Sequence, residues 1–224
     1  MLRTQVSELE LDGAEGQMTQ VVTLPDISWQ TYQAMLSDMG EHRAARLSYY
    51  QGTLTLKMPS QLHEIINRLL ARIVTTLTEE LDLDVVNIGS TTLGRESKKA
   101  GAEPDTGFYI QNALRLEGLD PAIPDKLPPD LVVEVDITSP STRRLTIYKV
   151  LGVAEVWQYT KREGVRMYAL EADEYVRVEA SIAFPKLTVT TLNGFLEMRQ
   201  GASENQVIRA VRAWATLQPE DITT

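Results

Sequence analysis

Three carboxylates lie on one face of a predicted β-strand. Asp130, Glu134 and Asp136 alternate with apolar residues in residues 129–137, which read Pro-Asp-Leu-Val-Val-Glu-Val-Asp-Ile. Alternation with a period of two predicts a strand whose opposite face is apolar. Each carboxylate raises the free energy of ionising the next one, and a bound divalent cation would relieve this repulsion. The segment therefore leads to the hypothesis of a metal site.

A second acidic segment begins in the same way. Pro104-Asp105 precedes the apolar residues 108–110, just as Pro129-Asp130 precedes the apolar residues 131–133. If the two strands are neighbours with matching faces, Asp105 and Glu134 converge on one cation. Mg²⁺ or Mn²⁺ binds hard oxygen ligands and keeps several waters, so one or two carboxylates suffice. Such an ion polarises a phosphoryl oxygen and lowers the pKa of an attacking water, which is the chemistry of phosphoester hydrolysis.

The elements that position these residues follow from hydrophobic periodicity. Helices are predicted over residues 28–40, 60–81, 144–151 and 204–217, and from residue 185 onward. Strands are predicted over residues 46–50, 53–58, 85–93, 103–110, 130–137, 155–160, 165–170 and 175–179. This order predicts an α/β sandwich in which a mixed β-sheet is flanked by helices.

The domain organisation follows from the same pass along the chain. We expect residues 1–22 to form a flexible N-terminal arm, because they are polar and have no sustained period. Residues 23–200 are expected to form one domain, and residues 201–224 a C-terminal helix that packs on it.

Composition narrows the possible chemistry. The 224 residues include no cysteine and only two histidines, which argues against thiolate and multi-histidine zinc sites. The net charge of −9 argues against a protein that coats nucleic acid through bulk charge, although a local basic rim is compatible with it. No apolar run reaches about 18 residues and no signal pattern is present, so we expect a soluble, cytoplasmic protein without membrane contact.

Several strings carry a resemblance to a known family. They occur in order along residues 28–160 and read Met58-Pro59-Ser60 with His63, Ala102-Glu103-Pro104-Asp105 with Phe108-Tyr109-Ile110, residues 129–135, Ser139-Pro140-Ser141, and residues 151–157. Together they resemble the large bacterial family of Uma2-type restriction endonucleases, within the PD-(D/E)xK nuclease superfamily. The resemblance implies a restriction-endonuclease-like core and a Mg²⁺- or Mn²⁺-dependent endonuclease acting on DNA. Nucleases of this size often act as homodimers.

The resemblance also implies roles for individual residues. Asp105 matches the first metal-binding aspartate, and Glu134 matches the acidic member of the (D/E)xK element. The carbonyl of Val135 is implied as a further ligand, and Glu64 occupies the place of an additional helical glutamate. Glu64 has an alternative role, because Arg68 four residues later can form an exposed helical ion pair with it.

The chain departs from the superfamily at the lysine. Asp136 stands two residues after Glu134, where that lysine is expected. Related proteins often place it on the next helix, four residues before a tyrosine matched here by Tyr148, and this position is Arg144. Arginine can stabilise a phosphate but cannot act as a general base. Lys149 is the nearest lysine, and the spacing favours Arg144 over it.

Two other functions are compatible with this departure. The chain can be a catalytically inactive module that binds nucleic acid or assembles with a partner. It can also be a hydrolase of small phosphoesters, because an acidic metal site does not by itself select its substrate.

Overall fold

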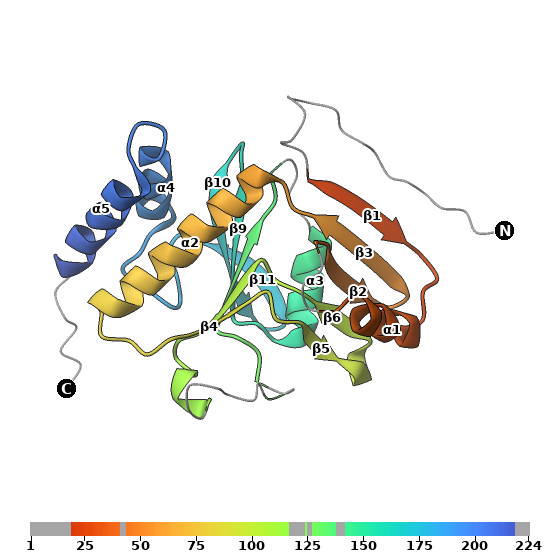
Figure 1. Cartoon of the computed structure of the whole chain (residues 1–224). Coiled ribbons are helices and arrows are strands. Elements are labelled where there is room, and N and C mark those ends of the chain that lie inside the picture. Colours follow the sequence, from red (N-terminus) through yellow and green to blue (C-terminus); the bar gives the residue numbers. More distant parts are fainter. Residues whose placement is uncertain (1–18, 41–43, 117–123, 125–126, 138–141, 218–224) are drawn as a thin grey trace.

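Two β-sheets form the framework of the protein (Figure 1). The computed structural model describes residues 19–40, 44–116, 124, 127–137 and 142–217. The N-terminal sheet has the strand order β1-β3-β2-β6-β5. Its strands are β1 (Gln20–Leu24), β2 (Arg46–Tyr50), β3 (Thr53–Met58), β5 (Leu93–Arg95) and β6 (Ala100–Ala102). All of its neighbouring strands are antiparallel.

The central sheet is mixed and has the order β11-β10-β9-β8-β7-β4. Its strands are β4 (Val86–Gly89), β7 (Thr106–Tyr109), β8 (Leu131–Val135), β9 (Glu155–Thr160), β10 (Gly164–Glu171) and β11 (Glu174–Val178). β8 and β9 are parallel, whereas the other neighbouring pairs are antiparallel. The helices are α1 (Trp29–Met39), α2 (Gln61–Glu80), α3 (Thr142–Leu151), α4 (Val189–Met198) and α5 (Glu204–Thr216).

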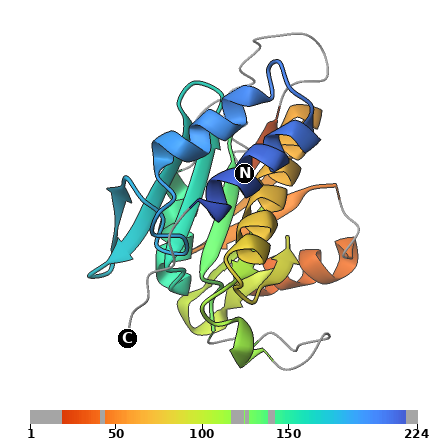
Figure 2. The same ribbon diagram turned by 90° about the vertical axis from the view of Figure 1, so that its left-hand side faces the viewer.

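The largest core lies between one face of the central sheet and three helices. Leu131, Val133 and Val135 of β8 point into it, as the alternation in the sequence predicts. The apolar stripe of α2 packs against them, and α4 and α5 complete the layer, as Figure 2 shows. Each fully buried aliphatic side chain contributes about 1.5–3 kcal/mol to stability. This packing holds β8 in a fixed orientation.

The opposite face of β8 looks toward α3. Val132 shares a buried cluster with Ile147 and Tyr148 of α3, and with Ala100 and Ala102 of the N-terminal sheet. α3 therefore lies between the two sheets (Figure 1). Since Glu134 is two residues beyond Val132, it points into the same interval between the sheets. The fold thus encloses a carboxylate-bearing strand face.

Aromatic packing joins α1 to the N-terminal sheet. Ser28 caps α1, and the ring of Tyr32 stacks on that of Tyr49 with centroids 5.2 Å apart. A Cβ atom at Gly101 would lie 2.6 Å from the Tyr32 hydroxyl, so only glycine fits this position of β6 without a shift. The close approach fixes α1 against β2 and β6.

The expected α/β class and its mixed sheet flanked by helices are confirmed, and the structure adds a second, antiparallel sheet. The sequence did not indicate this second sheet, because its strands β1, β5 and β6 are short and lack strong hydrophobic alternation. The expected arm boundary at residue 22 falls inside β1, and residues 1–18 lie outside the described residues. The predicted helix after residue 185 begins at Val189. Ser139-Pro140-Ser141 also lies outside the described residues.

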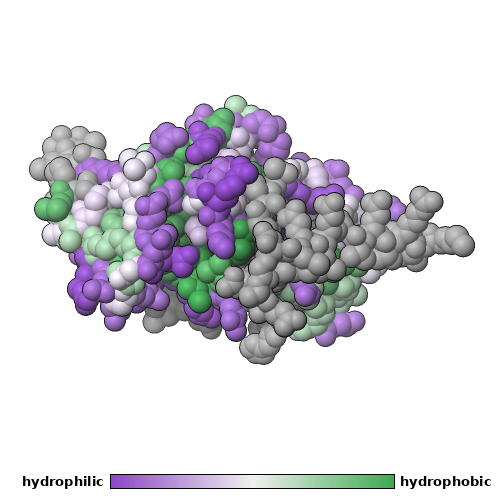
Figure 3. Space-filling model, turned by 90° about the horizontal axis from the view of Figure 1, so that it is seen from above, coloured by the Kyte–Doolittle hydropathy of each residue, from purple (hydrophilic) through white to green (hydrophobic). Residues whose placement is uncertain are grey.

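Figure 3 shows one face of the molecule, on which polar residues cover much of the described surface. Seen from above, hydrophilic residues surround apolar areas (Figure 3).

The C-terminal helix α5 packs on α2. It contributes Val207, Ile208 and Val211 to the largest core. None of the described helices combines the length and the apolar character needed to cross a membrane.

Candidate active site

Asp105 directly precedes β7 and lies opposite Glu134 of the neighbouring strand β8. β7 and β8 are antiparallel with Thr106 paired to Val133, so the next position of the register sets Asp105 against Glu134. The backbone N–H of Val135 donates a hydrogen bond of 2.8 Å to Asp105 Oδ2. Both carboxylates are buried. The structure therefore brings together the two residues on which the metal-site hypothesis depends.

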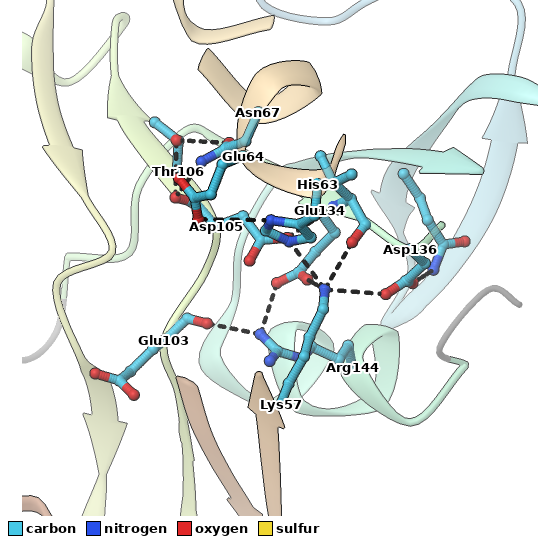
Figure 4. Close-up of polar contacts among 12 residues, drawn as sticks. Lys57, His63, Glu64, Asn67, Glu103, Asp105, Thr106, Glu134, Asp136 and Arg144 are labelled. Carbon is cyan, nitrogen blue, oxygen red and sulfur yellow. Dashed lines mark hydrogen bonds and ion pairs between the residues drawn. The ribbon is translucent and has the colours of Figure 1, made fainter. Parts of the chain in front are cut away.

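The Lys57 ammonium lies among these carboxylates (Figure 4). Lys57 belongs to β3, and its Nζ donates to the Val135 carbonyl at 2.7 Å and to Asp136 Oδ1 at 3.1 Å. The same nitrogen donates to Asp105 Oδ2 at 3.2 Å and lies 3.6 Å from Glu134 Oε2. One cation from the N-terminal sheet thus contacts all three carboxylates.

Arg144 is the second cation of the site. Its Nη1 donates to Glu134 Oε1 at 2.8 Å and to the Glu103 carbonyl at 2.6 Å. Tyr148, one turn further along α3, donates its hydroxyl proton to the same Glu134 oxygen. Residues four apart share a helix face, so α3 presents both donors to Glu134. The buried Nη2 of Arg144 has no hydrogen-bond partner among the described residues. We call Lys57, Asp105, Glu134, Asp136 and Arg144 the buried cluster.

The surroundings shift the pKa values of Glu134 and Asp105 in opposite directions. Burial raises the pKa of Glu134 above its ordinary value of 4.5, and the positive charge of Arg144 only partly opposes this. Burial also acts to raise the pKa of Asp105, but Lys57 and His63 hold it well below its ordinary value of 3.8. Asp105 is therefore the firmly ionised member of the pair.

Lys57 remains protonated despite its burial. Desolvation alone would lower the pKa of its ammonium, but the carboxylates of Asp105, Asp136 and Glu134 raise it above the ordinary value of 10.5. Arg144 is held in its charged form by the nearby Glu134 in the same way, against the effect of burial. Both side chains are thus permanent positive charges within the cluster at neutral pH.

The first turns of α2 hold Asp105 in place. Ser60 caps this helix and accepts a hydrogen bond of 3.3 Å from the His63 N–H. His63 is buried, and its Nε2 lies 2.8 Å from Asp105 Oδ2. One turn later, Asn67 Nδ2 donates to the Asp105 carbonyl at 3.1 Å. The helix therefore contacts both the side chain and the backbone of Asp105.

A polar cleft borders the buried cluster. Its volume is about 300 Å³, and Lys57, Asp136 and Arg144 contribute to its lining. Arg143 lies beside them, and Ser48 and Thr55 of the N-terminal sheet form part of the wall. A ligand that enters the cleft can therefore reach both cations of the cluster.

Of two further candidate residues named from the sequence, Lys149 lies away from the cluster and Glu64 lies next to His63 at its edge. Lys149 Nζ forms an ion pair of 2.7 Å with Glu174 of β11, so the structure does not bring it to the cluster. The partly exposed Glu64 lies 3.6 Å from His63 Nδ1 and 4.0 Å from Arg68 Nε. This geometry corresponds to the helical pair with Arg68 considered as its alternative role.

Comparisons with known proteins agree with the resemblance read from the sequence. The model of the Uma2 family, described as "Putative restriction endonuclease", matches residues 29–200. The chain belongs to the Uma2 family. A crystal structure of a "putative nuclease belonging to DUF820" from Anabaena variabilis is similar to this Uma2 chain, with a TM-score of 0.53 and 14% identity. The match covers 83% of this chain and 99% of the other, and it shows a shared fold. No curated protein matches the chain.

The donor atoms of this Uma2 chain fit a divalent cation in their chemistry. Asp105 Oδ1 and Glu134 Oε2 are buried and accept no hydrogen bond within the described part of the chain. With the Val135 carbonyl they form the all-oxygen donor set that Mg²⁺ prefers. No group of three His, Cys, Asp or Glu side chains among the described residues is arranged as a metal centre. The Lys57 ammonium lies among these oxygens instead.

Sequence reasoning did not select two residues of the site. Lys57 follows the alternation Thr53-Leu54-Thr55-Leu56, which places it on the polar face of its strand with Thr55. From the sequence alone, this polar face is predicted to be exposed to solvent. Its contact with the carboxylates appears only in the structure. His63 had no partner visible in the sequence, because its contact with Asp105 joins positions 42 residues apart. The available signal was a lysine two residues before the Pro59-Ser60 pair that precedes α2.

Proposed function

We propose that this Uma2 chain is a divalent-cation-dependent nuclease that hydrolyses DNA phosphodiester bonds. The observation that carries the proposal is the meeting of Asp105 and Glu134 in a buried cluster beside a polar cleft. The family description supports a nuclease, and restriction-endonuclease-like families generally use divalent metals. Mg²⁺ or Mn²⁺ bound by Asp105, Glu134 and the Val135 carbonyl would stabilise charge on a phosphoryl oxygen and acidify a nearby water.

Arg144 is the residue that we assign to phosphate stabilisation. Its guanidinium is held by Glu134 and by the Glu103 carbonyl, which leaves Nη2 without a protein partner among the described residues. Arg144 also lines the cleft. A phosphate oxygen in the cleft would accept the remaining N–H bonds, and the donor would need little reorganisation as negative charge develops. Because Arg144 stays charged, we assign it no role as a proton acceptor.

The cleft also accounts for how an acidic chain can approach DNA. The net charge of −9 opposes binding over the whole surface. Arg143, Arg144 and Lys57 all line the same cleft, so a phosphate backbone would meet positive charge there. We further propose that the nuclease acts as a homodimer, since two copies would place one site on each strand of a duplex.

A non-cleaving nucleic-acid-binding module is the second candidate function. It is favoured by Lys57, whose ammonium contacts the Val135 carbonyl and the carboxylates that would otherwise receive the divalent ion. Such a module would use the cations of the cleft for phosphate contact without hydrolysis.

Cleavage of a supercoiled plasmid and of a labelled duplex with Mg²⁺ or Mn²⁺ tests the proposed activity. We expect the wild type to nick DNA and Glu134→Gln to be slower by about 10²–10³-fold, because Glu134 would lose its charge within the cluster. Lys149→Met is expected to cleave like the wild type, because Lys149 pairs with Glu174 away from the cluster.

Equal nicking by the wild type and Glu134→Gln would reject the assignment. Duplex binding by a wild type that shows no nicking with either metal would favour the second candidate function. A large loss of cleavage in Lys149→Met would show that Lys149, and not Arg144, is the catalytic cation.

A further inference from the structure

We infer that Lys57 is a built-in competitor for the divalent cation, whose binding requires the ammonium to leave the oxygens of Asp105, Glu134 and Val135. This inference rests on the proposed cation site. It adds that the chain itself occupies this site until the metal displaces Lys57.

Lys57 contacts two of the proposed ligand atoms, the Val135 carbonyl and Glu134 Oε2, and it contacts the second carboxylate oxygen of Asp105, whose Oδ1 is the proposed ligand. Its Nζ lies 2.7 Å from the Val135 carbonyl, 3.2 Å from Asp105 Oδ2 and 3.6 Å from Glu134 Oε2. Mg²⁺ binds oxygen at about 2.0–2.1 Å and requires near-octahedral geometry. An ammonium and a metal ion that share these oxygens would lie within a few ångströms of each other and repel. The two cations therefore exclude each other.

The formal charges lead to the same conclusion. With His63 counted as neutral, the cluster contains three carboxylates and two cations, all of them buried. A divalent ion added to this set would leave a buried excess of positive charge, which is costly without pairing. If Lys57 withdraws, the divalent ion and Arg144 approximately balance the carboxylates.

The structure offers a place for the displaced side chain. Lys57 lines the cleft together with Asp136, Ser48 and Thr55. Asp136 contacts the ammonium at 3.1 Å and lines the cleft, so it marks the side of the cluster on which Lys57 can turn outward. The cleft volume of about 300 Å³ leaves room for an ammonium group. Withdrawal would thus exchange the buried oxygen contacts of the ammonium for contacts with solvent in the cleft.

Mn²⁺ binding measured without nucleic acid tests the inference. Titrations by calorimetry and by electron paramagnetic resonance would compare the wild type, Lys57→Met, and the exposed control Lys161→Met. We expect Lys57→Met to bind Mn²⁺ at least about tenfold more tightly than the wild type and the control. A further Asp105→Asn change should abolish that gain. Equal or weaker binding by Lys57→Met would overturn the inference.

Two further measurements apply if Lys57→Met does not fold. Lys57→Gln keeps a hydrogen-bond donor for the Val135 carbonyl, and the same tighter binding is expected of it. In the wild type, displacement should expose the Lys57 ammonium, so its acetylation, measured by mass spectrometry, should rise with Mn²⁺ concentration. Unchanged acetylation of Lys57 at the highest Mn²⁺ concentration would overturn the inference.

These outcomes are independent of the nuclease assay. Tight Mn²⁺ binding by Lys57→Met, together with a wild type that does not cleave, would support the competition and reject the activity. Metal-dependent cleavage by the wild type, with no gain of Mn²⁺ affinity in Lys57→Met, would support the nuclease activity and reject the competition.

Discussion

Replacement of Arg144 by methionine is expected to lower the free energy of unfolding by about 3–5 kcal/mol, because it removes the cation that donates a hydrogen bond to the buried Glu134 carboxylate. Arg144 is buried and donates to Glu134 Oε1 at 2.8 Å and to the Glu103 carbonyl at 2.6 Å. Methionine fills part of the space but satisfies neither acceptor. Urea unfolding followed by circular dichroism would measure the loss.

The neighbouring Arg143 provides a matched control for this variant. It is exposed on the same turn of α3, so Arg143→Met should change stability by no more than about 0.5 kcal/mol. Adding Glu134→Gln to Arg144→Met should recover part of the loss, because the unpaired charge disappears. If the two substitutions change the free energy of unfolding additively, Glu134 is not the group that loses its partner when Arg144 is replaced.

The Arg144 effect should also depend on pH, with a defined sign. The pKa of Glu134 is already raised by burial, and Arg144 opposes that rise, so Arg144→Met raises it further. An acid with a raised folded-state pKa contributes stability below its unfolded-state value of about 4.5, and this stability is lost as pH rises through the folded-state pKa. The deficit of Arg144→Met should therefore be smallest in acid and should grow toward neutral pH.

Local periodicity was sufficient to predict β8 and its two faces. Leu131, Val133 and Val135 enter the core beneath α2, and Glu134 points to the opposite side. A strand has only two faces, so alternation assigns each side chain without knowledge of the partner strands. The pairing of β7 with β8 was expected only conditionally, yet their antiparallel register sets Asp105 against Glu134.

Helix geometry explains why only one of two candidate cations on α3 reaches the cluster. Successive residues turn by about 100°, so Arg144 and Tyr148 share a face, whereas Lys149 is about 140° from Arg144. Tyr148 and Arg144 accordingly contact Glu134, and Lys149 contacts Glu174. The spacing that favoured Arg144 over Lys149 thus has a direct geometric basis.

The strands β2 and β3 were predicted, but the position of Lys57 beside the carboxylates could not be predicted from local sequence. The bond from Lys57 to Asp105 joins residues 48 positions apart, and the bond to the Val135 carbonyl spans 78 positions. A lysine on a polar strand face is ordinarily solvated, and burial is tolerated here because carboxylates surround it. Such a site becomes visible only when the contact of the Lys57 ammonium with the end of β8 is known. The pairing of short strands such as β5 and β6 is similarly set by tertiary contacts.

The two buried Pro-Asp pairs, at Asp105 and Asp130, allow a catalytic effect to be distinguished from a structural one by comparing their Asn variants. We expect Asp105→Asn to reduce DNA cleavage by about 10²–10³-fold, because it removes a charge from the proposed cation site. Asp105 Oδ2 also accepts hydrogen bonds from Lys57 and from the Val135 N–H, so stability should fall as well. Its folded-state pKa is depressed, so the wild type loses this stability as pH falls through that pKa, and the two proteins should converge in acid.

Asp130→Asn is the matched control for Asp105→Asn. Asp130 Oδ2 accepts from the Ile110 N–H at 2.7 Å and from the Asn112 N–H at 2.9 Å, which fixes the turn after β7. Its loss should lower the free energy of unfolding by about 1–3 kcal/mol while cleavage per folded molecule stays the same. Rates normalised to the folded fraction would show the difference. Wild-type cleavage by Asp105→Asn, or an equal loss in both variants, would mean that Asp105 acts on the reaction only through folding.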